Sequence, residues 1–366
     1  MKVRQICMMV LLGLGVIPAM QAQTFDKLWK EVEQAEKKSL PKTVIKLTDE
    51  IYQKGEKERN SAQMLKAYMW RMKTQDILTP DSFYVGLRDL EQWAKQTEQP
   101  MDRAILHSLI AEFYANYAAD NQWQLRQRTE IVGETPSADI REWTANMFVE
   151  KVRTNVKEAL ADSLLLLKTS SLNYIPFVEL GETSEYYHHD MYHLLASRAI
   201  RALNQIERLE RGSFNGITAS PVKQDIINIY ERMTDAYETV GLKEGYVLTM
   251  LQYLEWKRGN DNKLQPVQLK KGLGEWTADT YNAALDELKR QFKSEPICAE
   301  VYLAQVRYAV EKMQQVNALQ LCDEAIRLYP GYRRINALKN LREEILAPFL
   351  NVSAVSQAFP NEEIKL

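Results

Sequence analysis

Hydrophobic positions recur at helical spacing along most of the chain. The first such stripe consists of Phe25, Leu28, Trp29 and Val32. A second stripe after Pro41 consists of Val44, Leu47, Thr48, Ile51 and Tyr52, and a third of Leu65, Tyr68, Met69 and Met72. Residues at i, i+3, i+4 and i+7 share one face of a helix, so these stripes predict amphipathic helices, the second ending at Gly55.

The same reading predicts many further helices and a few longer loops. Further helices are predicted over residues 86–97, 101–118, 139–168, 190–209, 222–239, 244–258, 277–293, 297–313, 317–329 and 333–346. Longer loops are predicted near 74–85, 119–137, 169–187 and 259–275, and the last two are the best candidates for hinges or contact surfaces. Short links between the other helices favour antiparallel hairpins.

One predicted hairpin resembles a tetratricopeptide unit. Its pattern consists of Leu303-Ala304 in the first helix, then Ala318, Ala325 and Tyr329-Pro330 in the second. Small residues let two helices approach closely, and the proline ends the second helix, but the link at 314–317 is longer than the pattern expects. Trp29 and Pro41 indicate a degenerate copy near the start. No strict period of about 34 residues runs through the chain. We therefore predict an all-α fold, a solenoid of diverged tetratricopeptide-like hairpins over residues 23–347, with an irregular α-bundle as the alternative.

The last residues, 348–366, follow a different pattern. After Pro348, Leu350, Val352 and Ala354 alternate with polar residues at the two-residue period of a strand, and the alternation resumes after a turn signal at Pro360-Asn361. Isolated strands need partners that this chain does not supply. We expect a short β-like tail without a stable sheet of its own, and a chain that is the front part of something larger.

The first residues have the pattern of a secretory signal peptide. Lys2 and Arg4 precede an apolar run from Ile6 to Met20, and small or polar residues follow around Ala22. The run is shorter than a spanning helix, which needs about 20 apolar residues. We predict a signal peptide at 1–22, cleaved after Ala22, and hence an exported protein in the periplasm or cell envelope of a Gram-negative bacterium.

Charge and composition argue against nucleic-acid binding, a β-rich fold and a disulfide bond. Lysine and arginine number 47 against 49 acidic residues, a net charge of -2, which gives no electrostatic argument for nucleic acid. Glycine (14) and proline (12) are scarce, which argues against a β-rich fold. Cys298 and Cys322 would remain after cleavage, and we predict free thiols because a helical hairpin offsets them along its axis.

Candidate chemistry is confined to a histidine cluster. The sequence contains no Gly-rich phosphate loop, Gly-x-Ser-x-Gly elbow or His-Glu-x-x-His pair. In the cluster at 186–193, His189 and His193 would lie one turn apart on a helix starting near Asp190, a spacing that suits zinc.

The favoured interpretation of this cluster is structural. Asp190 would cap the helix, His193 would pack in the core, and His188 has no assigned role. His107 and Glu185 are other conceivable metal donors. We predict no catalytic, cofactor-binding or metal-ligating residue and no cofactor, and a metal-dependent enzyme is the weakest alternative.

Whole segments of the chain resemble a known family. Residues 25–58, 140–167, 173–200 and 329–352 are similar to the N-terminal helical region of large alpha-2-macroglobulin-like proteins from Gram-negative gut bacteria of the Bacteroides type. The resemblance implies a protease trap, with macroglobulin β-sandwich domains, a bait segment and often a thioester. Residues 348–366 would then be the truncated start of the first such domain.

The thioester of that family is missing from this chain. It needs Cys-x-Glu-Gln, whereas Cys298 is followed by Ala-Glu-Val and Cys322 by Asp-Glu-Ala. The resemblance therefore implies a non-catalytic scaffold or docking module of an exported inhibitor, with downstream macroglobulin domains, envelope proteins or proteases as partners. The alternative is a free-standing periplasmic protein-interaction scaffold, and neither reading involves nucleic acid or a membrane span.

Overall fold

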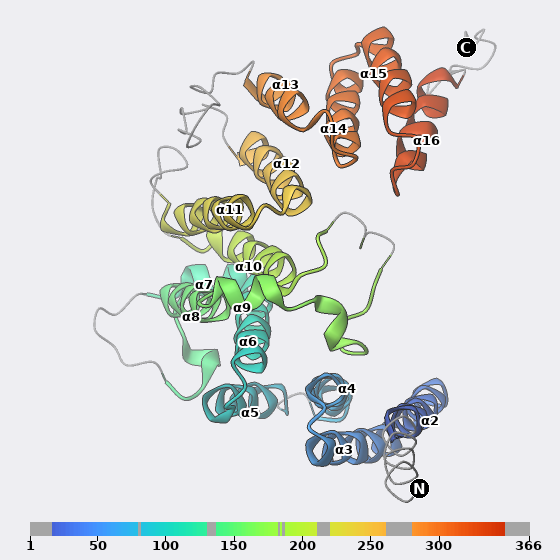
Figure 1. Cartoon of the computed structure of the whole chain (residues 1–366). Helices are drawn as coiled ribbons and strands as arrows, with labels where there is room; N and C mark the ends of the chain where they lie inside the picture. Colours follow the sequence, from blue (N-terminus) through green and yellow to red (C-terminus); the bar gives the residue numbers. More distant parts are fainter. Residues whose placement is uncertain are drawn as a thin grey trace, which may run out of the picture. The chain divides into compact units, whose positions relative to one another are not determined.

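Helix-to-helix contacts divide the chain into two units, Met1–Gly245 and Tyr246–Leu366 (Figure 1). The computed structural model describes residues 17–79, 82–129, 137–181, 184, 187–210, 220–260 and 280–347. Within these ranges the regular structure is helical, apart from one antiparallel bridge between Ser170 and Asp190. The all-α prediction is confirmed for this part of the chain.

In its described residues the first unit contains α-helices and the 3-10 helices η1 and η2. They are α2 (Ile17–Lys37), α3 (Pro41–Glu58), α4 (Ser61–Leu78), α5 (Ser82–Gln96), α6 (Pro100–Asp120), α7 (Gln122–Gln127), η1 (Ile140–Glu142), α8 (Ala145–Ala159), α9 (Ser163–Lys168), η2 (Ser171–Tyr174), α10 (Met191–Glu207) and α11 (Pro221–Val240). Helix α12 (Lys243–Asn260) begins in the first unit, and the second unit adds α13 (Thr280–Phe292), α14 (Cys298–Glu311), α15 (Gln315–Leu328) and α16 (Ile335–Leu346). None of the helices in the described ranges combines the length and apolarity that crossing a membrane requires.

Helix starts follow the local sequence. Pro41, Pro100 and Pro221 each occupy the first turn of a helix, where the missing N–H costs nothing. Asn60 caps α4 by accepting a hydrogen bond from the backbone N–H of Gln63 at 3.2 Å. These short-range signals explain why most of the predicted helices are found within a few residues of their expected bounds.

Three predictions about the elements are wrong. Residues 139–168 are not one helix but η1, α8 and α9. Asp162 accepts a hydrogen bond from Leu165 N at 3.0 Å and so starts α9 as a separate helix. The loops predicted at 74–85 and 119–137 are shorter, since α4 runs to Leu78 and α7 lies within the second.

Gly55 also has a different role from the predicted one. Helix α3 continues past it to Glu58, and a Cβ at Gly55 would lie 2.9 Å from Met64 Cγ. Gly55 therefore lies at a close approach of α4 to α3, and not at a helix end.

Helix α6 lies at the centre of the first unit. It contacts α5, α7, α8 and α10, and its buried residues occur on nearly every face. A helix surrounded by other helices needs apolar side chains all round, which explains the long run from Met101 to Ala118.

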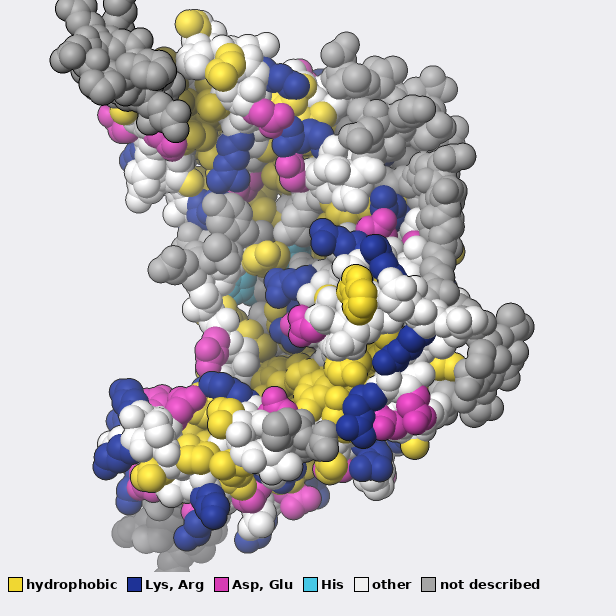
Figure 2. Space-filling view, turned by 180° about the vertical axis from the view of Figure 1, so that it is seen from behind, with side chains coloured by type: hydrophobic (Ala, Val, Ile, Leu, Met, Phe, Trp, Pro, Cys, Tyr) yellow, Lys and Arg dark blue, Asp and Glu magenta, His cyan; other side chains and the backbone are white. Residues whose placement is uncertain are grey.

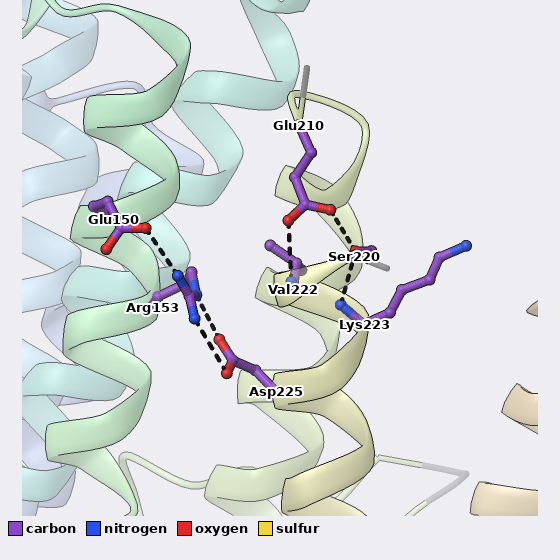
Figure 3. A network of polar contacts seen from close by, with 7 residues as sticks. All are labelled: Glu150, Arg153, Glu210, Ser220, Val222, Lys223 and Asp225. Atoms are coloured by element: carbon purple, nitrogen blue, oxygen red, sulfur yellow. Dashed lines mark hydrogen bonds and ion pairs between the residues drawn. The ribbon is translucent and has the colours of Figure 1, made fainter. Parts of the chain in front are cut away.

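The joint between α10 and α11 is held by polar contacts (Figure 3). Glu210 accepts hydrogen bonds from the Ser220 hydroxyl and from Val222 N, the latter at 3.0 Å. Ser220 also caps α11 by accepting from Lys223 N at 3.1 Å. Beside them, Arg153 of α8 donates to Asp225 of α11 at 2.6 Å. A carboxylate at a helix N-terminus satisfies free N–H groups and opposes the positive end of the helix dipole.

In the second unit, α14 and α15 form the hairpin predicted from the small residues. Ala318, Cys322 and Ala325 of α15 are fully buried, and Tyr329 donates to Lys293 O at 2.8 Å. The link between the helices is residues 312–314, shorter than the sequence suggested, because α15 already begins at Gln315.

Helix α16 is joined to this hairpin by a buried ion pair. Arg334 Nη1 lies 2.6 Å from both carboxylate oxygens of Glu300, and the side chains are 5% and 6% exposed. A buried charge is tolerated when it is paired and hydrogen-bonded, as here.

Cys298 and Cys322 are both buried and free. Burial raises the pKa of both thiols, that of Cys322 to about 11 from 9.0. Burial likewise raises the pKa of the Tyr192 phenol to about 12 from 10.0. The folded state therefore keeps protons that the unfolded chain releases in alkaline solution.

We expect the free energy of unfolding to fall as the pH rises above about 9. Each group contributes stability that is complete below its unfolded pKa and is lost as the pH rises through its folded pKa. The loss for Cys322 alone should be on the order of 2 kcal/mol at pH 11, at about 1.4 kcal/mol per pKa unit. Urea unfolding at pH 7, 9 and 11 measures this fall in the free energy of unfolding. Cys322→Ala should lose less than the parent chain over this range, and equal losses would contradict the assignment.

Two predicted segments at the chain ends lie outside the described residues. They are the β-like tail at 348–366 and the first sixteen residues, 1–16, of the predicted signal peptide. Helix α2 starts at Ile17, so cleavage after Ala22 would fall inside its first turns.

Candidate functional site

The histidine cluster is organised around Asp190, the N-cap of α10. Asp190 Oδ1 accepts a hydrogen bond from His193 N at 2.7 Å, and the Asp190 side chain is almost fully buried. His193 is completely buried. The predicted capping role of Asp190 is confirmed, and so is the core position of His193.

Asp190 has further partners on both sides. His188 Nδ1 lies 2.7 Å from Asp190 Oδ2, and the Tyr237 hydroxyl donates to the two carboxylate oxygens at 2.9 and 3.1 Å. Burial, followed by the Asp190 charge, raises the pKa of Tyr237. A Cβ at Gly245 would lie 2.5 Å from the Tyr237 ring, so glycine is favoured at this position in the first turn of α12. The cluster joins a loop to α10, α11 and the start of α12.

Of the other residues considered as metal donors, His107 lies at a different helix contact. His107 Nδ1 lies 2.8 Å from Asn155 Oδ1, at the contact of α6 with α8. Glu185 and Tyr186 lie outside the described residues. Among the residues that the structure does describe, no group of three or more His, Cys, Asp or Glu side chains is placed to hold a metal ion.

A pocket of about 340 Å³ opens next to this region. Its walls come from α4, α6 and α10 and from the loop after η2. The lining residues are Lys66, Met69, Trp70, Ile105, Ser108, Leu109, Phe177, Val178, Glu179, Met191, Leu194, Leu195 and Arg198. The face drawn in Figure 2 is hollowed in its lower half, where hydrophobic side chains gather between charged ones. The size and the mostly apolar walls are those of a ligand or side-chain binding site.

The loop that forms one wall is closed at its base. Ser171 N donates to His189 O at 3.0 Å, and Met191 N donates to Thr169 O at 2.8 Å. Residues 169–191 therefore leave and re-enter the helical body at one place, while residues 177–179 reach the pocket. A loop with joined ends is a common carrier of function.

Asp102 anchors the same loop to the helices below it. Tyr174 of η2 donates to Asp102 Oδ1 at 2.9 Å, and Ser61 of α4 donates to Asp102 Oδ2 at 2.5 Å. Asp102 is buried in the first turn of α6, where a carboxylate is favoured by the helix dipole. This contact fixes the loop wall relative to both α4 and α6.

The charges around the pocket are paired. Lys66 lies 3.2 Å from Glu179 across the mouth, and Arg198 forms an ion pair with Glu112 of α6. Burial lowers the pKa of the Arg198 guanidinium, an effect that Glu112 opposes. The Glu179 side chain is 77% exposed, so its pair with Lys66 is a surface ion pair that contributes little free energy.

Ser108 is the uncharged polar residue among the lining side chains. Its side chain is 5% exposed, and its hydroxyl oxygen has no hydrogen-bond partner among the described residues. Because that oxygen is closed to solvent while the pocket is open, it does not face the space that an occupant would fill.

The sequence predicted the loop at 169–187, like that at 259–275, as a candidate hinge or contact surface, but it did not predict this pocket. The walls come from segments far apart in the chain, and Ser108 sits in an otherwise apolar helical stripe. A lone serine in such a stripe was the only signal in the sequence that could have pointed to the pocket. Comparisons with protein-family models, curated proteins and solved structures found no match to this chain.

Proposed function

We propose that the chain is a helical docking module that binds a protein partner through the pocket between α4, α6 and α10. The observation that carries the proposal is this pocket, with mostly apolar walls and a loop fixed over one side. A groove between helices that receives apolar side chains is a recurring mode of protein recognition.

The proposal includes a solenoid of diverged tetratricopeptide-like hairpins. The contacts of α2 with α3, α3 with α4, and α14 with α15 support it, because each pair is joined by a short link. The small buried residues of α15 also match the repeat pattern.

In the wider setting, we propose that this module is the N-terminal arm of an exported alpha-2-macroglobulin-like inhibitor. The segment resemblance and the signal-peptide pattern at 1–22 support this part of the proposal. On this view the partner is a macroglobulin domain or another envelope protein, and the chain itself performs no catalysis.

Photo-crosslinking in the native cell tests the proposal. A photoreactive residue at Met69 or Leu194, both half-buried in the pocket wall, should form a specific crosslink with one envelope protein. The same residue at Trp123, which is 75% exposed on α7, is the matched control. Mass spectrometry should identify a macroglobulin-type protein at the pocket positions only, together with an N-terminus at Gln23. Equal labelling at all three positions, or a cytoplasmic chain that keeps Met1, would contradict it.

A further inference from the structure

We infer that α2, α3 and α4 form a body that pivots on the rest of the first unit and is held closed by a strap, residues 171–180 of the loop after α9. We call these three helices the N-terminal body. The pocket is the space at this joint, with α4 on one side and α6 and α10 on the other. The inference goes beyond the proposed function, because it holds whatever enters the pocket.

The N-terminal body has a hydrophobic core of its own. Figure 1 shows its three helices together at one end of the first unit, next to α5. The buried residues of this core are Phe25, Trp29, Val32, Ala35, Val44, Ile51 and Ala67. Because these apolar side chains bury one another, the body keeps its packing when it moves as a whole.

The N-terminal body is packed tightly against α5. Tyr68 of α4 donates to Gly86 O at 2.7 Å, and its ring centroid lies 5.7 Å from that of Trp93. A Cβ at Gly86 would lie 3.0 Å from Met72 Cγ, so the two helices approach closely there. This contact of α4 with α5 is the pivot.

On the side of α6 and α10 the N-terminal body is held more loosely. Within the described ranges, α4 packs on α3 and α5, whereas the main neighbours of α6 and α10 are other helices. A pocket of about 340 Å³ lies between α4 and these two helices. Side chains that face such a space lose dispersion contacts, so direct packing adds little free energy to closure on this side.

The strap supplies the connection that packing does not. Helix η2 contacts α4, and its Tyr174 donates to Asp102 Oδ1 of α6 at 2.9 Å. Ser61 of α4 donates to the other oxygen of the same carboxylate, which is buried. Hydrogen bonds to a buried charged group are the strong ones. The pair of Glu179 with Lys66 is mostly exposed and adds little, so Tyr174 is the latch.

Cysteine accessibility on α6 tests the latch. Ile105→Cys places a thiol in the pocket wall, and Ala115→Cys is the matched control, fully buried on the same helix outside the pocket. Adding Tyr174→Phe should raise the rate of thiol labelling at position 105 about ten- to hundredfold, the value of a hydrogen bond to a charged group. The rate at position 115 should not change. Adding Glu179→Gln should raise the rate at position 105 by less than about fivefold.

A wedge in the pocket tests the pivot. Leu194→Trp enlarges a half-buried side chain of α10 that lines the pocket. Together with Tyr174→Phe it should push the N-terminal body away, because a packed body moves as a unit. Spin labels on the exposed positions Lys46→Cys of α3 and Lys157→Cys of α8 should show a changed distance by electron paramagnetic resonance. Labels on Arg88→Cys of α5 and Lys157→Cys should show the same distance with and without the wedge.

Three results would overturn the inference. Equal rises in labelling at positions 105 and 115 would mean that Tyr174→Phe destabilises the whole unit. An unchanged rate at position 105 would mean that the strap holds nothing closed, and this result does not require the wedge variant to fold. A distance change in neither label pair, or in both, would mean that the N-terminal body does not pivot on α5.

Discussion

Glu300→Ala should remove about 3–5 kcal/mol from the free energy of unfolding of the second unit, the cost of leaving one buried charge without its partner. Arg334 is nearly inaccessible to solvent, with both of its short contacts to Glu300 made by one guanidinium nitrogen. Once the carboxylate is gone, the guanidinium keeps its desolvation cost and loses the charge that offset it. Urea unfolding, with amide exchange read separately over α14, α15 and α16, measures the loss.

The same unit offers a matched control on its surface. Arg342 and Asp323 form an ion pair whose side chains are 33% and 60% exposed, so Asp323→Ala should cost less than about 1 kcal/mol. A double variant, Glu300→Leu with Arg334→Met, should recover most of the loss, because it removes both charges. If Glu300→Ala costs no more than Asp323→Ala, the buried pair does not stabilise the unit in the way described.

Asp190→Ala should cost the first unit on the order of 3 kcal/mol, and the reason is that one carboxylate serves several buried donors. The variant removes the N-cap of α10, worth about 1 kcal/mol, and leaves the buried Tyr237 hydroxyl without its acceptor, worth about 1–3 kcal/mol more. It also removes the contact of Asp190 with His188 Nδ1. Thermal or urea unfolding of the first unit is the measurement.

Two further variants show which of these contacts matters. Asp190→Asn keeps an acceptor oxygen for the cap and should recover a large part of the loss. Asp162→Ala removes the cap of the short helix α9 from an exposed position and should cost about 1 kcal/mol or less. Similar losses for Asp190→Ala and Asp162→Ala would show that the contacts of Asp190 beyond capping add nothing.

The helices were predictable because their signals are short-range. A proline at the first turn, a capping side chain and an apolar stripe all act within a few residues, so α3, α6 and α11 could be read from the chain. Asp162 shows the limit of that reading. It looks like an ordinary polar residue inside the apolar pattern at 139–168, but its side chain competes for a backbone N–H and divides the helix.

The candidate site was less predictable, because it depends on which helices meet. Ser108, Phe177 and Leu194 share a pocket only after α6, the loop and α10 have packed together. Likewise, Glu300 and Arg334 each resemble a surface charge in the sequence, and only the contact of α14 with α16 makes them a buried pair. The capping role of Asp190 could be predicted, since a cap depends only on the residues directly after it in the sequence.

The contacts of Glu210 have a consequence for how α11 opens. Because Glu210 hydrogen-bonds Ser220 and Val222, the first turn of α11 is tied to a residue outside the helix. Fraying of α11 from this end must therefore break those contacts as well as the hydrogen bonds of the helix itself.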